Sequence, residues 1–469
     1  MSSETQPLVL MCSTPVSGHI IPMLAIAGQL IARNYDVCFV SGSGYRQQAE
    51  ALGAKFFPVE GYGDYYDLTS WDLDADCTYL FGIFFYALAG PEGEKHLEGP
   101  ACFQHDLIHI FCKSLPSQHE AIQRALKALK TEHPQRPVFV MTESLNFGAL
   151  AIRLGAPGLQ PDGFIAIGLN PILLTSMDHS PFGSGMLPDR TPKGRERNRV
   201  ANAAQKQFFT PSQDAYTEAL KSVGAEPSDE FLLDSLYTLP DRFIQMCTPS
   251  AEYHRSDAPD TLRFAGGYPA TGSTTSTWEK PAWWEEVVAE KSVTGKKIVF
   301  VCQGTVAMDF NQLVIPTMEA LRNRPDINIL IALGRPGATL PANVSVPANC
   351  QVADFIPYDS ILPHVDVFIT TGGYGSFQRA LNNGTPLIMA GTTEEKPESA
   401  ARAEWAGVAV NLRTTYPSAE QLSQAVYEIL DNDKFKKRAL EIQTEISQYD
   451  PVGVIIESIE ELAKRKGRD

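Results

Sequence analysis

A histidine near the start of the chain is the first residue placed to do chemistry. His19 follows Gly18, a few residues after the apolar run 8–12. An imidazole ionises near neutral pH and can take a proton from a hydroxyl group. A histidine that only caps a helix or bonds to a nearby carbonyl would occupy the same position. The position alone therefore favours a catalytic role only slightly.

A glycine-rich turn far along the chain is the second such feature. The run 365–370 predicts a buried strand, and Thr371-Gly-Gly-Tyr-Gly-Ser376 leads from it into a helix that ends at Gly384. Glycines at the first turn of a helix expose backbone N–H groups at the positive end of its dipole. We therefore expect this turn to hold a phosphate-bearing ligand. No GxGxxG follows the first strand, which argues against a nicotinamide dehydrogenase.

Composition and length limit the class of protein. The chain has 469 residues, which predicts two large domains, and a formal net charge of −16. That charge argues against nucleic acid and against anionic membrane surfaces, although backbone amides can still bind phosphate. The N-terminus lacks the basic start of a signal peptide, and the apolar stretch 79–89 is too short to span a bilayer. Eight cysteines without CxxC pairing favour a reducing, cytoplasmic location.

The elements that must position these residues alternate between strand and helix. Such alternation predicts α/β architecture with parallel sheets covered on both faces. In the first half we expect strands at 8–12, 37–41, 55–59 and 138–142 and helices at 23–34, 47–52 and 118–131. In the second half we expect strands at 297–302, 327–333, 350–353, 365–370, 387–390 and 408–411 and a helix at 312–323.

This pattern predicts two doubly wound, Rossmann-like domains. The Pro-, Gly- and Trp-rich stretch within 251–295 reads as the linker between them. We therefore expect domains at 1–250 and 296–450 and a terminal helix within 451–469. Two long insertions, the aromatic block 62–90 and the segment 178–210, are typical of lids or binding loops.

A set of short motifs in a fixed order gives the chain a resemblance. The motifs are Gly18-His19-x-x-Pro22, Gln303-Gly-Thr305, Phe355-Ile-Pro357, Thr371-Gly-Gly-Tyr-Gly-Ser376 and Thr393-Glu-Glu-Lys-Pro-Glu398. Together they resemble the UDP-dependent glycosyltransferases of family one, which have the GT-B fold. The similarity is greatest to a bacterial and fungal branch whose donor motif reads T-N-G-G-Y-G. The resemblance implies two domains that face each other across a cleft.

The resemblance implies a catalytic pair in the first domain. His19 matches the family's base, which removes the proton of an acceptor hydroxyl. An acidic residue at the end of a later strand orients that histidine, and Glu143 stands where the branch has aspartate. Either carboxylate can hold an imidazole N–H and stabilise the imidazolium. A solvated carboxylate at the end of a strand is the alternative for Glu143.

The resemblance also implies donor-binding residues. The residues at the matching positions are Gly18, Gln303, Thr305, Phe355, Ile356, Thr371, Gly373, Tyr374, Gly375, Ser376, Glu395 and Lys396. Gln303 and Thr305 would offer polar groups to the diphosphate, and the turn from Gly373 to Ser376 would hold it. Phe355 and the Ile356 backbone would contact the uracil. An ordinary turn at Gln303 and a core aromatic at Phe355 are the alternatives.

Two positions depart from the family pattern. Thr371 stands where most members have a histidine, which replaces an imidazole donor by a weaker hydroxyl. Glu395-Lys396 stands where many have Asp/Glu-Gln, so a cation replaces an amide beside the sugar. Glucose is therefore only the default donor. A solvated charged loop would explain both residues without a role in binding.

The expected activity is inverting transfer of a sugar from a UDP-sugar to a hydrophobic small molecule, which gives a β-glycoside. The aromatic block 62–90 suits such an acceptor. His105 and His109 have the spacing of a helical metal pair, but no third ligand is apparent, and the family works without a metal or other cofactor. A nucleotide-sugar epimerase or hydrolase on the same fold is the nearest rival. A non-catalytic partner protein with this fold is the rival from another class.

Overall fold

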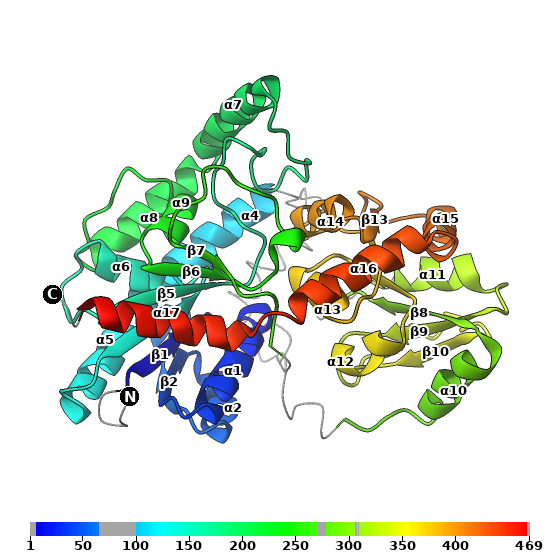
Figure 1. Cartoon of the computed structure of the whole chain (residues 1–469), viewed down its shortest axis with the longest axis horizontal. Coiled ribbons are helices and arrows are strands. Elements are labelled where there is room, and N and C mark those ends of the chain that lie inside the picture. Colours follow the sequence, from blue (N-terminus) through cyan, green and yellow to red (C-terminus); the bar gives the residue numbers. More distant parts are fainter. Residues whose placement is uncertain (1–5, 65–99, 270–277, 305–306, 308, 467–469) are drawn as a thin grey trace.

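Two parallel β-sheets, each in its own domain, form the frame of the molecule (Figure 1). The computed structural model describes residues 6–64, 100–269, 278–304, 307 and 309–466. All strand pairs in both sheets are parallel. Parallel sheets need both faces covered, and helices lie on both faces of each sheet. The predicted α/β class with two doubly wound domains is confirmed.

The first sheet has seven strands in the order β3-β2-β1-β4-β5-β6-β7. Its strands are β1 (Leu8–Cys12), β2 (Val37–Ser41), β3 (Lys55–Pro58), β4 (Val138–Glu143), β5 (Gly163–Gly168), β6 (Arg242–Gln245) and β7 (Leu262–Phe264). Its helices are α1 (Ser17–Ala32), α2 (Arg46–Ala51), α4 (Pro100–Asp106), α5 (Lys113–Glu132), α6 (Leu150–Arg153), α7 (Pro192–Phe208), α8 (Thr210–Ser222) and α9 (Leu232–Thr238). A π-helix, Leu107–Cys112, joins α4 to α5.

The second sheet has six strands in the order β10-β9-β8-β11-β12-β13. Its strands are β8 (Lys297–Cys302), β9 (Ile327–Ala332), β10 (Cys350–Ala353), β11 (Val367–Thr370), β12 (Leu387–Met389) and β13 (Ala409–Asn411). The helices of this half are α10 (Trp284–Thr294), α11 (Val314–Leu321), α12 (Tyr358–Ile361), α13 (Tyr374–Asn382), α14 (Lys396–Trp405), α15 (Ala419–Leu430) and α16 (Asp433–Ile446). In each sheet the strand order reverses next to the first strand of the domain, which is where ligands bind in such folds.

Alternating side chains of β1 show how one strand serves two layers. Val9 and Met11 belong to one apolar cluster, with residues of α1, whereas Leu8 and Leu10 belong to another, with residues of α5. Successive residues of a strand point to opposite faces, so a strand covered on both sides must be apolar throughout. Each of these four side chains is 2% exposed or less.

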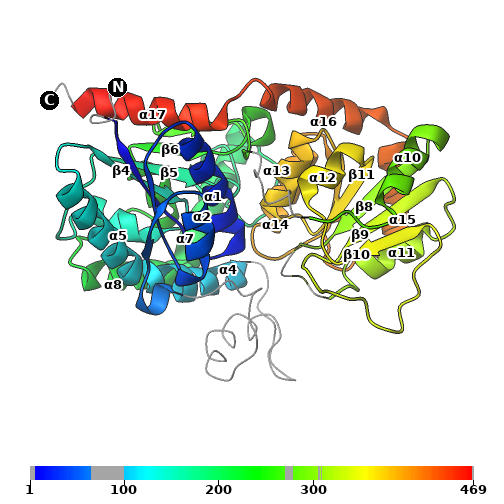
Figure 2. The same ribbon diagram turned by 90° about the horizontal axis from the view of Figure 1, so that it is seen from below.

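The last helix returns to the first domain. Helix α17 (Pro451–Lys466) lies along the first domain, while α16 before it lies along the second (Figure 2). Ile455 and Ile459 are buried in the same cluster as Val9 of β1. Arg242 of β6 also pairs with Glu461 at 3.2 Å. The chain thus crosses between the domains twice, and its terminal helix is part of the first domain's cover.

The structure differs from the expected boundaries at two places. The strand β7 lies in the first sheet and α10 packs on the second domain, so both ends of the range 251–295 belong to domains rather than to a linker. Helix α1 begins at Ser17, six residues before the expected start at residue 23, so Pro22 lies inside the helix. Pro22 cannot donate to the carbonyl of Gly18, which costs the helix one bond next to His19.

Part of the acceptor-side prediction falls on residues 65–99, outside the described residues. The segment 178–210 forms a loop followed by α7, which projects from the first domain (Figure 1). Within the described ranges, no helix combines the length and apolar character needed to cross a membrane.

Candidate active site

Neighbouring strands deliver the predicted catalytic pair to one edge of the first sheet. In the β1–β4 pair, Cys12 lies beside Thr142, so the residues that follow each strand emerge together. Glu143 is the last residue of β4, and His19 lies in the first turn of α1, a few residues after β1. This edge is the reversal point of the strand order.

The two side chains are in direct contact. Nδ1 of His19 and Oε2 of Glu143 are 2.9 Å apart. The Glu143 side chain is fully buried, whereas 13% of the His19 side chain remains exposed. The carboxylate is therefore shielded and the imidazole still reaches solvent, which is the arrangement that a base with an orienting partner requires.

Further donors fix the carboxylate of Glu143. The Thr14 hydroxyl donates a short hydrogen bond to Oε1, and the N–H of Leu145 donates to Oε2 at 2.7 Å. Burial would raise the pKa of Glu143, but the charge of His19 and these donors outweigh burial and hold that pKa below its ordinary value. Glu143 is thus ionised and can only accept hydrogen bonds, so Nδ1 of His19 donates the proton in the bond between them.

Electrostatics raise the pKa of His19. Burial alone would lower it, but the charge and hydrogen bond of Glu143, with a smaller contribution from Glu395, raise it above its ordinary value. Glu395 belongs to the second domain. The electrostatic contribution of Glu395 to the pKa of His19 therefore acts across the boundary between the two domains.

An aromatic ring lies beside the imidazole, and a second ring packs against the first. The ring of Phe111, in the π-helix Leu107–Cys112, lies 6.0 Å from that of His19 between centroids, and Phe147 lies 6.4 Å beyond Phe111. π-Helical turns inside α-helices occur frequently at functional sites. Phe111 is 7% exposed and Phe147 is fully buried, so both rings belong to the apolar core next to the imidazole.

The glycine-rich turn occupies the matching edge of the second sheet. Cys302 of β8 lies beside Thr370 of β11, so the loops after these strands meet. The Thr371 hydroxyl donates to the backbone carbonyl of Gln303 at 2.9 Å, which joins the two loops. Thr371 is only 4% exposed, so its hydroxyl serves this link rather than solvent. Its predicted contact with phosphate remains a prediction.

Helix α13 begins inside this turn. Gly373 is the residue before the helix, and the N–H of Tyr374 donates to Oε1 of Glu395 at 3.1 Å. The first N–H groups of a helix lack partners within the helix and bind anions. The N-terminus of α13 therefore already donates to an anionic oxygen. A Cβ added to Gly375 would meet nothing within 4 Å, so the backbone there lies beside open space.

The side chains of Tyr374 and Ser376 both have hydrogen-bond partners within the protein. The Tyr374 ring is 1% exposed, and its hydroxyl accepts from Gln245 of the first domain at 3.0 Å. The Ser376 hydroxyl bonds to that of Tyr358 at 3.2 Å. The predicted contacts of both residues with a diphosphate remain predictions.

Two charged residues follow at the start of α14. Glu395 precedes the helix, and Lys396 is its first residue. Lys396 forms a short ion pair with Glu394 and donates to the Thr393 hydroxyl at 2.9 Å. Burial would lower the pKa of Lys396, but Glu394 and Glu395 raise it. Lys396 is therefore a cation that already has a carboxylate partner.

Gln303 organises the loop that it begins. Its side-chain oxygen accepts from the N–H groups of Leu313 and Val314, both at 3.1 Å, and its amide group donates to the carbonyls of Ala307 and Asp309. This set of bonds uses the side chain for local structure. Thr305, predicted beside it, is outside the described residues.

The predicted uracil contacts lie after β10. Phe355 is 37% exposed, and Ile356 is 2% exposed. The Trp278 indole N–H donates to the carbonyl of Phe355 at 3.3 Å. Phe355 is thus a surface aromatic with room to stack, not a core side chain. Gly18, the remaining predicted residue, lies on the surface in the first turn of α1.

His105 and His109, the predicted helical pair, lie side by side. The rings of His105 and His109 lie 4.5 Å apart between centroids. Burial and the charges of His105 and Lys113 lower the pKa of His109. Among the described residues, no group of three His, Cys, Asp or Glu is arranged to hold a metal ion.

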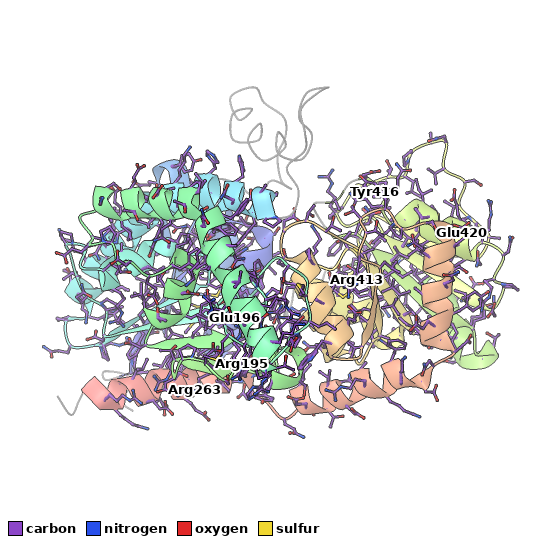
Figure 3. The ribbon with its side chains drawn as sticks, turned by 90° about the horizontal axis from the view of Figure 1, so that it is seen from above. Arg195, Glu196, Arg263, Arg413, Tyr416 and Glu420 are labelled. Carbon is purple, nitrogen blue, oxygen red and sulfur yellow. The ribbon has the colours of Figure 1, made fainter. Side chains whose placement is uncertain are left out.

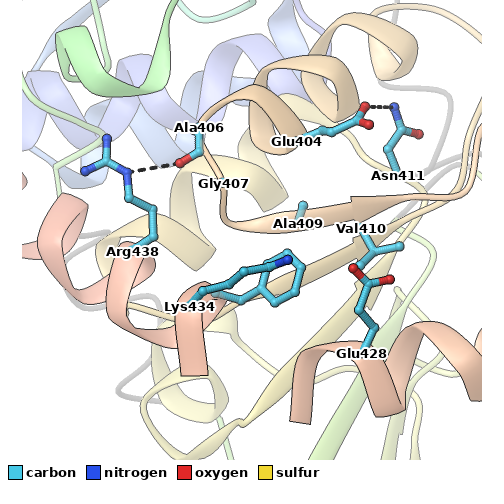
Figure 4. Close-up of a pocket in the computed structure, with 10 residues that line it drawn as sticks. Glu404, Ala406, Gly407, Ala409, Val410, Asn411, Glu428, Lys434 and Arg438 are labelled. Atoms are coloured by element: carbon cyan, nitrogen blue, oxygen red, sulfur yellow. Dashed lines mark hydrogen bonds between the residues drawn. The ribbon is translucent and has the colours of Figure 1, made fainter. Parts of the chain in front are cut away.

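A surface hollow on the second domain is separate from this site (Figure 4). It is lined by Glu404, Ala406, Gly407, Ala409, Val410, Asn411, Glu428, Lys434, Phe435 and Arg438. Arg438 donates to the carbonyl of Ala406 across one side of it. The lining contains none of the predicted site residues and carries charges of both signs, so it has no part in the chemistry described above.

The architecture agrees with that of solved glycosyltransferases. The structure of the glycosyltransferase of kitacinnamycin matches with a TM-score of 0.65 and 19% identity, over 97% of this chain and 99% of the other. The calicheamicin glycosyltransferase CalG4 matches with a TM-score of 0.64 over 98% and 99% of the two chains, at 15% identity. The fold is therefore GT-B.

Sequence comparison then gives the family. Residues 317–462 match the model of the erythromycin biosynthesis protein CIII-like C-terminal domain. UDP-glucosyltransferase A1 of Starmerella bombicola is 36% identical over 98% of this chain and 93% of its own length. The chain belongs to the UDP-dependent glycosyltransferases, as the motifs indicated. It is an enzyme that transfers a glycosyl group from a UDP-sugar.

The sequence interpretation missed some residues of this region. Thr14 directly precedes Pro15 at the end of the first strand, and a hydroxyl at that edge of a parallel sheet was a usable signal. The contact between Gln245 and Tyr374 joins the two domains, and no local sequence pattern predicts it. The segment around Gly183 and Gly185 was predicted to be a binding loop, and its observed contacts lie with α14 of the second domain.

Proposed function

We propose that the enzyme is an inverting glucosyltransferase that moves glucose from UDP-glucose to a hydroxyl of a hydrophobic small molecule. The observation that carries this proposal is the contact between His19 and Glu143, on the edge of the first domain that faces the Glu395 carboxylate of the second. The proposed product is a β-glycoside.

The bonding of the imidazole supports its role as the base. Since Nδ1 carries the proton donated to Glu143, Nε2 has a free lone pair when His19 is neutral. Nε2 takes the proton of the acceptor hydroxyl as its oxygen bonds to C1 of the sugar. The bond between C1 and the diphosphate oxygen breaks, and UDP leaves with the electron pair. Displacement from the opposite face turns an α-linked donor into a β-linked product.

Backbone amides at the start of α13 stabilise the departing diphosphate. Fixed N–H dipoles aimed at developing negative charge lower the barrier without having to reorganise. The bond from the Tyr374 N–H to Glu395 supports this assignment, because it puts an anionic oxygen at the same helix end. We infer that the diphosphate takes over this amide and releases Glu395 to accept hydrogen bonds from the sugar hydroxyls.

The charged residues expected beside the sugar favour a donor whose hexose is uncharged. Lys396 already pairs with Glu394, and Glu395 adds another negative charge. A uronic acid donor would bring its carboxylate next to these acids. The name of the relative from Starmerella bombicola, UDP-glucosyltransferase A1, supports glucose as the sugar.

The Phe111 ring beside His19, although only 7% exposed, gives the proposed acceptor an apolar neighbour. Flat apolar groups around a few polar ones are typical of small-molecule sites.

We propose that the amides of α13 and the residues named above suffice for transfer without a metal ion.

Mass spectrometry of reaction mixtures tests the proposal. The enzyme is incubated with UDP-glucose, UDP-galactose or UDP-glucuronic acid and with a set of phenolic, terpenoid and polyketide acceptors, with and without a chelator. We expect a mass gain of one hexose with UDP-glucose, unchanged by the chelator, and the β configuration by proton NMR. Preferential use of UDP-glucuronic acid, or loss of transfer with the chelator, would contradict the donor or metal assignment.

A further inference from the structure

Helix α14 belongs to the second domain but bonds to the first. Both ribbon views place it at the boundary between the two halves (Figures 1 and 2). The helix starts at Lys396, directly after Glu395. Any movement of α14 therefore moves the two charged residues expected beside the sugar.

Arg402 is the centre of the contact. It is 1% exposed, and its Nε donates to Oε1 of Glu252 in the first domain at 2.7 Å. Its Nη1 donates to Oε2 of Glu398 at 2.6 Å, and its Nη2 to the carbonyl of Ile172 at 3.3 Å. Its guanidinium carbon also lies 4.4 Å from the centre of the Tyr253 ring. Each nitrogen of the Arg402 guanidinium therefore donates a hydrogen bond. Three contacts of the guanidinium, with Glu252, Ile172 and Tyr253, lie in the first domain.

A loop of the first domain holds the other end of Glu398. The N–H groups of Gly183 and Gly185 both donate to its Oε1 at 2.9 Å. Gly185 has a φ of +59°, and a Cβ added there would lie 3.4 Å from the Cβ and the carbonyl oxygen of Pro397. A glycine is required because the backbone is left-handed and the helix is close. This loop is part of the insertion 178–210.

The charges in the contact balance. Glu252 and Glu398 are matched by Arg402 and by Arg255, which is 9% exposed and donates to the carbonyl of Leu174 at 2.7 Å. Burial would raise the pKa of Glu252, but the charges of Arg402 and Arg255 hold it below its ordinary value. A buried and balanced group of charges favours one geometry, because removal of any member leaves an opposite charge without its partner.

We propose that Glu398 and Arg402 are positioning residues, which hold the donor loop in register with the catalytic base of the other domain. This inference rests on the proposed function. The network fixes the first two turns of α14 on the first domain, and Glu395 precedes that helix directly. Misplacement of a reacting group by about 1 Å can cost about 100-fold in rate.

A role in positioning differs in its kinetics from a role in holding the domains together. The turn from Gly373 to Ser376 lies within the second domain, so binding of UDP itself does not need the network. Loss of positioning therefore lowers kcat and raises the KM for the UDP-sugar, while the Kd of UDP stays unchanged. A network that only stabilises the fold would lower the thermal midpoint without this split.

The test compares three variants. Glu398→Gln turns an amide N–H group either toward Arg402 or toward the N–H groups of the loop, so one of the two contacts is lost. Arg402→Lys keeps the charge but cannot reach three acceptors at once. Arg413→Gln is the matched control, since Arg413 pairs with Glu404 at 2.6 Å on the same helix but on the exposed surface of the second domain (Figure 3). Hydrogen exchange of the 181–187 peptide reports on the loop contact independently of activity.

We expect both network variants to lose about tenfold or more in kcat/KM for the donor, with faster exchange at 181–187 and an unchanged Kd of UDP. The control should stay within about twofold of the parent enzyme. Faster exchange with unchanged kcat/KM would overturn the positioning role. If Glu398→Gln does not fold, Gly185→Ala weakens the same contact from the loop side, and the same outcomes apply. An inactive parent enzyme would refute the proposed function instead, while the exchange data would still report on the contact.

Discussion

Nδ1 of His19 and Oε2 of Glu143 lie 2.9 Å apart although 124 residues separate them in the chain. Adjacent parallel strands bring them together, and burial of the carboxylate makes their attraction strong. The same contact raises the pKa of the imidazole, so the base is strengthened by the group that orients it.

Replacement of Glu143 by glutamine changes the pH dependence of the reaction. The neutral amide removes the charge that raises the pKa of His19, so that pKa falls. His19 then stays neutral to lower pH, and the acidic limb of the kcat/KM profile moves to lower pH. The maximal rate falls on the order of 100-fold because the imidazolium loses its counter-ion. Movement of the limb to higher pH would contradict this electrostatic account.

Replacement of Thr14 by valine tests the second partner of the carboxylate. The variant keeps the shape but removes the hydroxyl that donates to Oε1 of Glu143. A buried acceptor that loses its donor costs about 1–3 kcal/mol, so we expect kcat to fall about tenfold. Ser41→Ala is the control, since Ser41 donates to the carbonyl of Ser13 at 2.8 Å without contact to the pair. Equal losses of kcat in both variants would argue against a specific role of Thr14.

Replacement of Tyr374 by phenylalanine distinguishes the role of the side-chain hydroxyl from that of the backbone N–H. The hydroxyl contacts Gln245 of the first domain, and the N–H remains at the start of α13. We expect the free energy of unfolding to fall by about 1 kcal/mol. Calorimetry should show an unchanged Kd of UDP. Weaker UDP binding would mean that the tyrosine side chain, rather than the amide, contacts the nucleotide.

The buried carboxylate of Glu252 makes stability depend on pH. Its pKa in the folded protein lies below the ordinary value of 4.5, so the ionised form stabilises the fold above that pH. This stabilisation is lost as the pH falls through 4.5 toward the lower folded-state pKa. We expect Glu252→Gln to lower the thermal midpoint at pH 7 and to flatten the acid-side dependence. An unaltered acid-side curve in the variant would assign the dependence to other carboxylates.

Much of the frame follows from local sequence patterns. The strands at 8–12, 37–41, 297–302 and 350–353 have the predicted bounds. A short apolar run between turn residues is typical of a buried strand, and the turn residues mark its ends. The family motifs predicted the His19–Glu143 pair, and the parallel order of β1 and β4 explains why the two residues meet.

Contacts between the domains could not be read in the same way. Arg402 is fully buried, yet its sequence neighbours suggest the surface of a helix. Its partners in the first domain, Glu252 and the carbonyl of Ile172, come from distant segments whose approach depends on how two separate sheets face each other. Such long-range polar contacts have no periodic signature, whereas strands and amphipathic helices do.

His19 is the proposed base for transfer of a sugar from UDP-glucose. The most direct measurement compares hexose transfer by the parent enzyme and by His19→Ala, with the Kd of UDP measured on the same samples. We predict that the variant loses transfer and still binds UDP as the parent does. A His19→Ala variant that transfers hexose at the parental rate would contradict the claim.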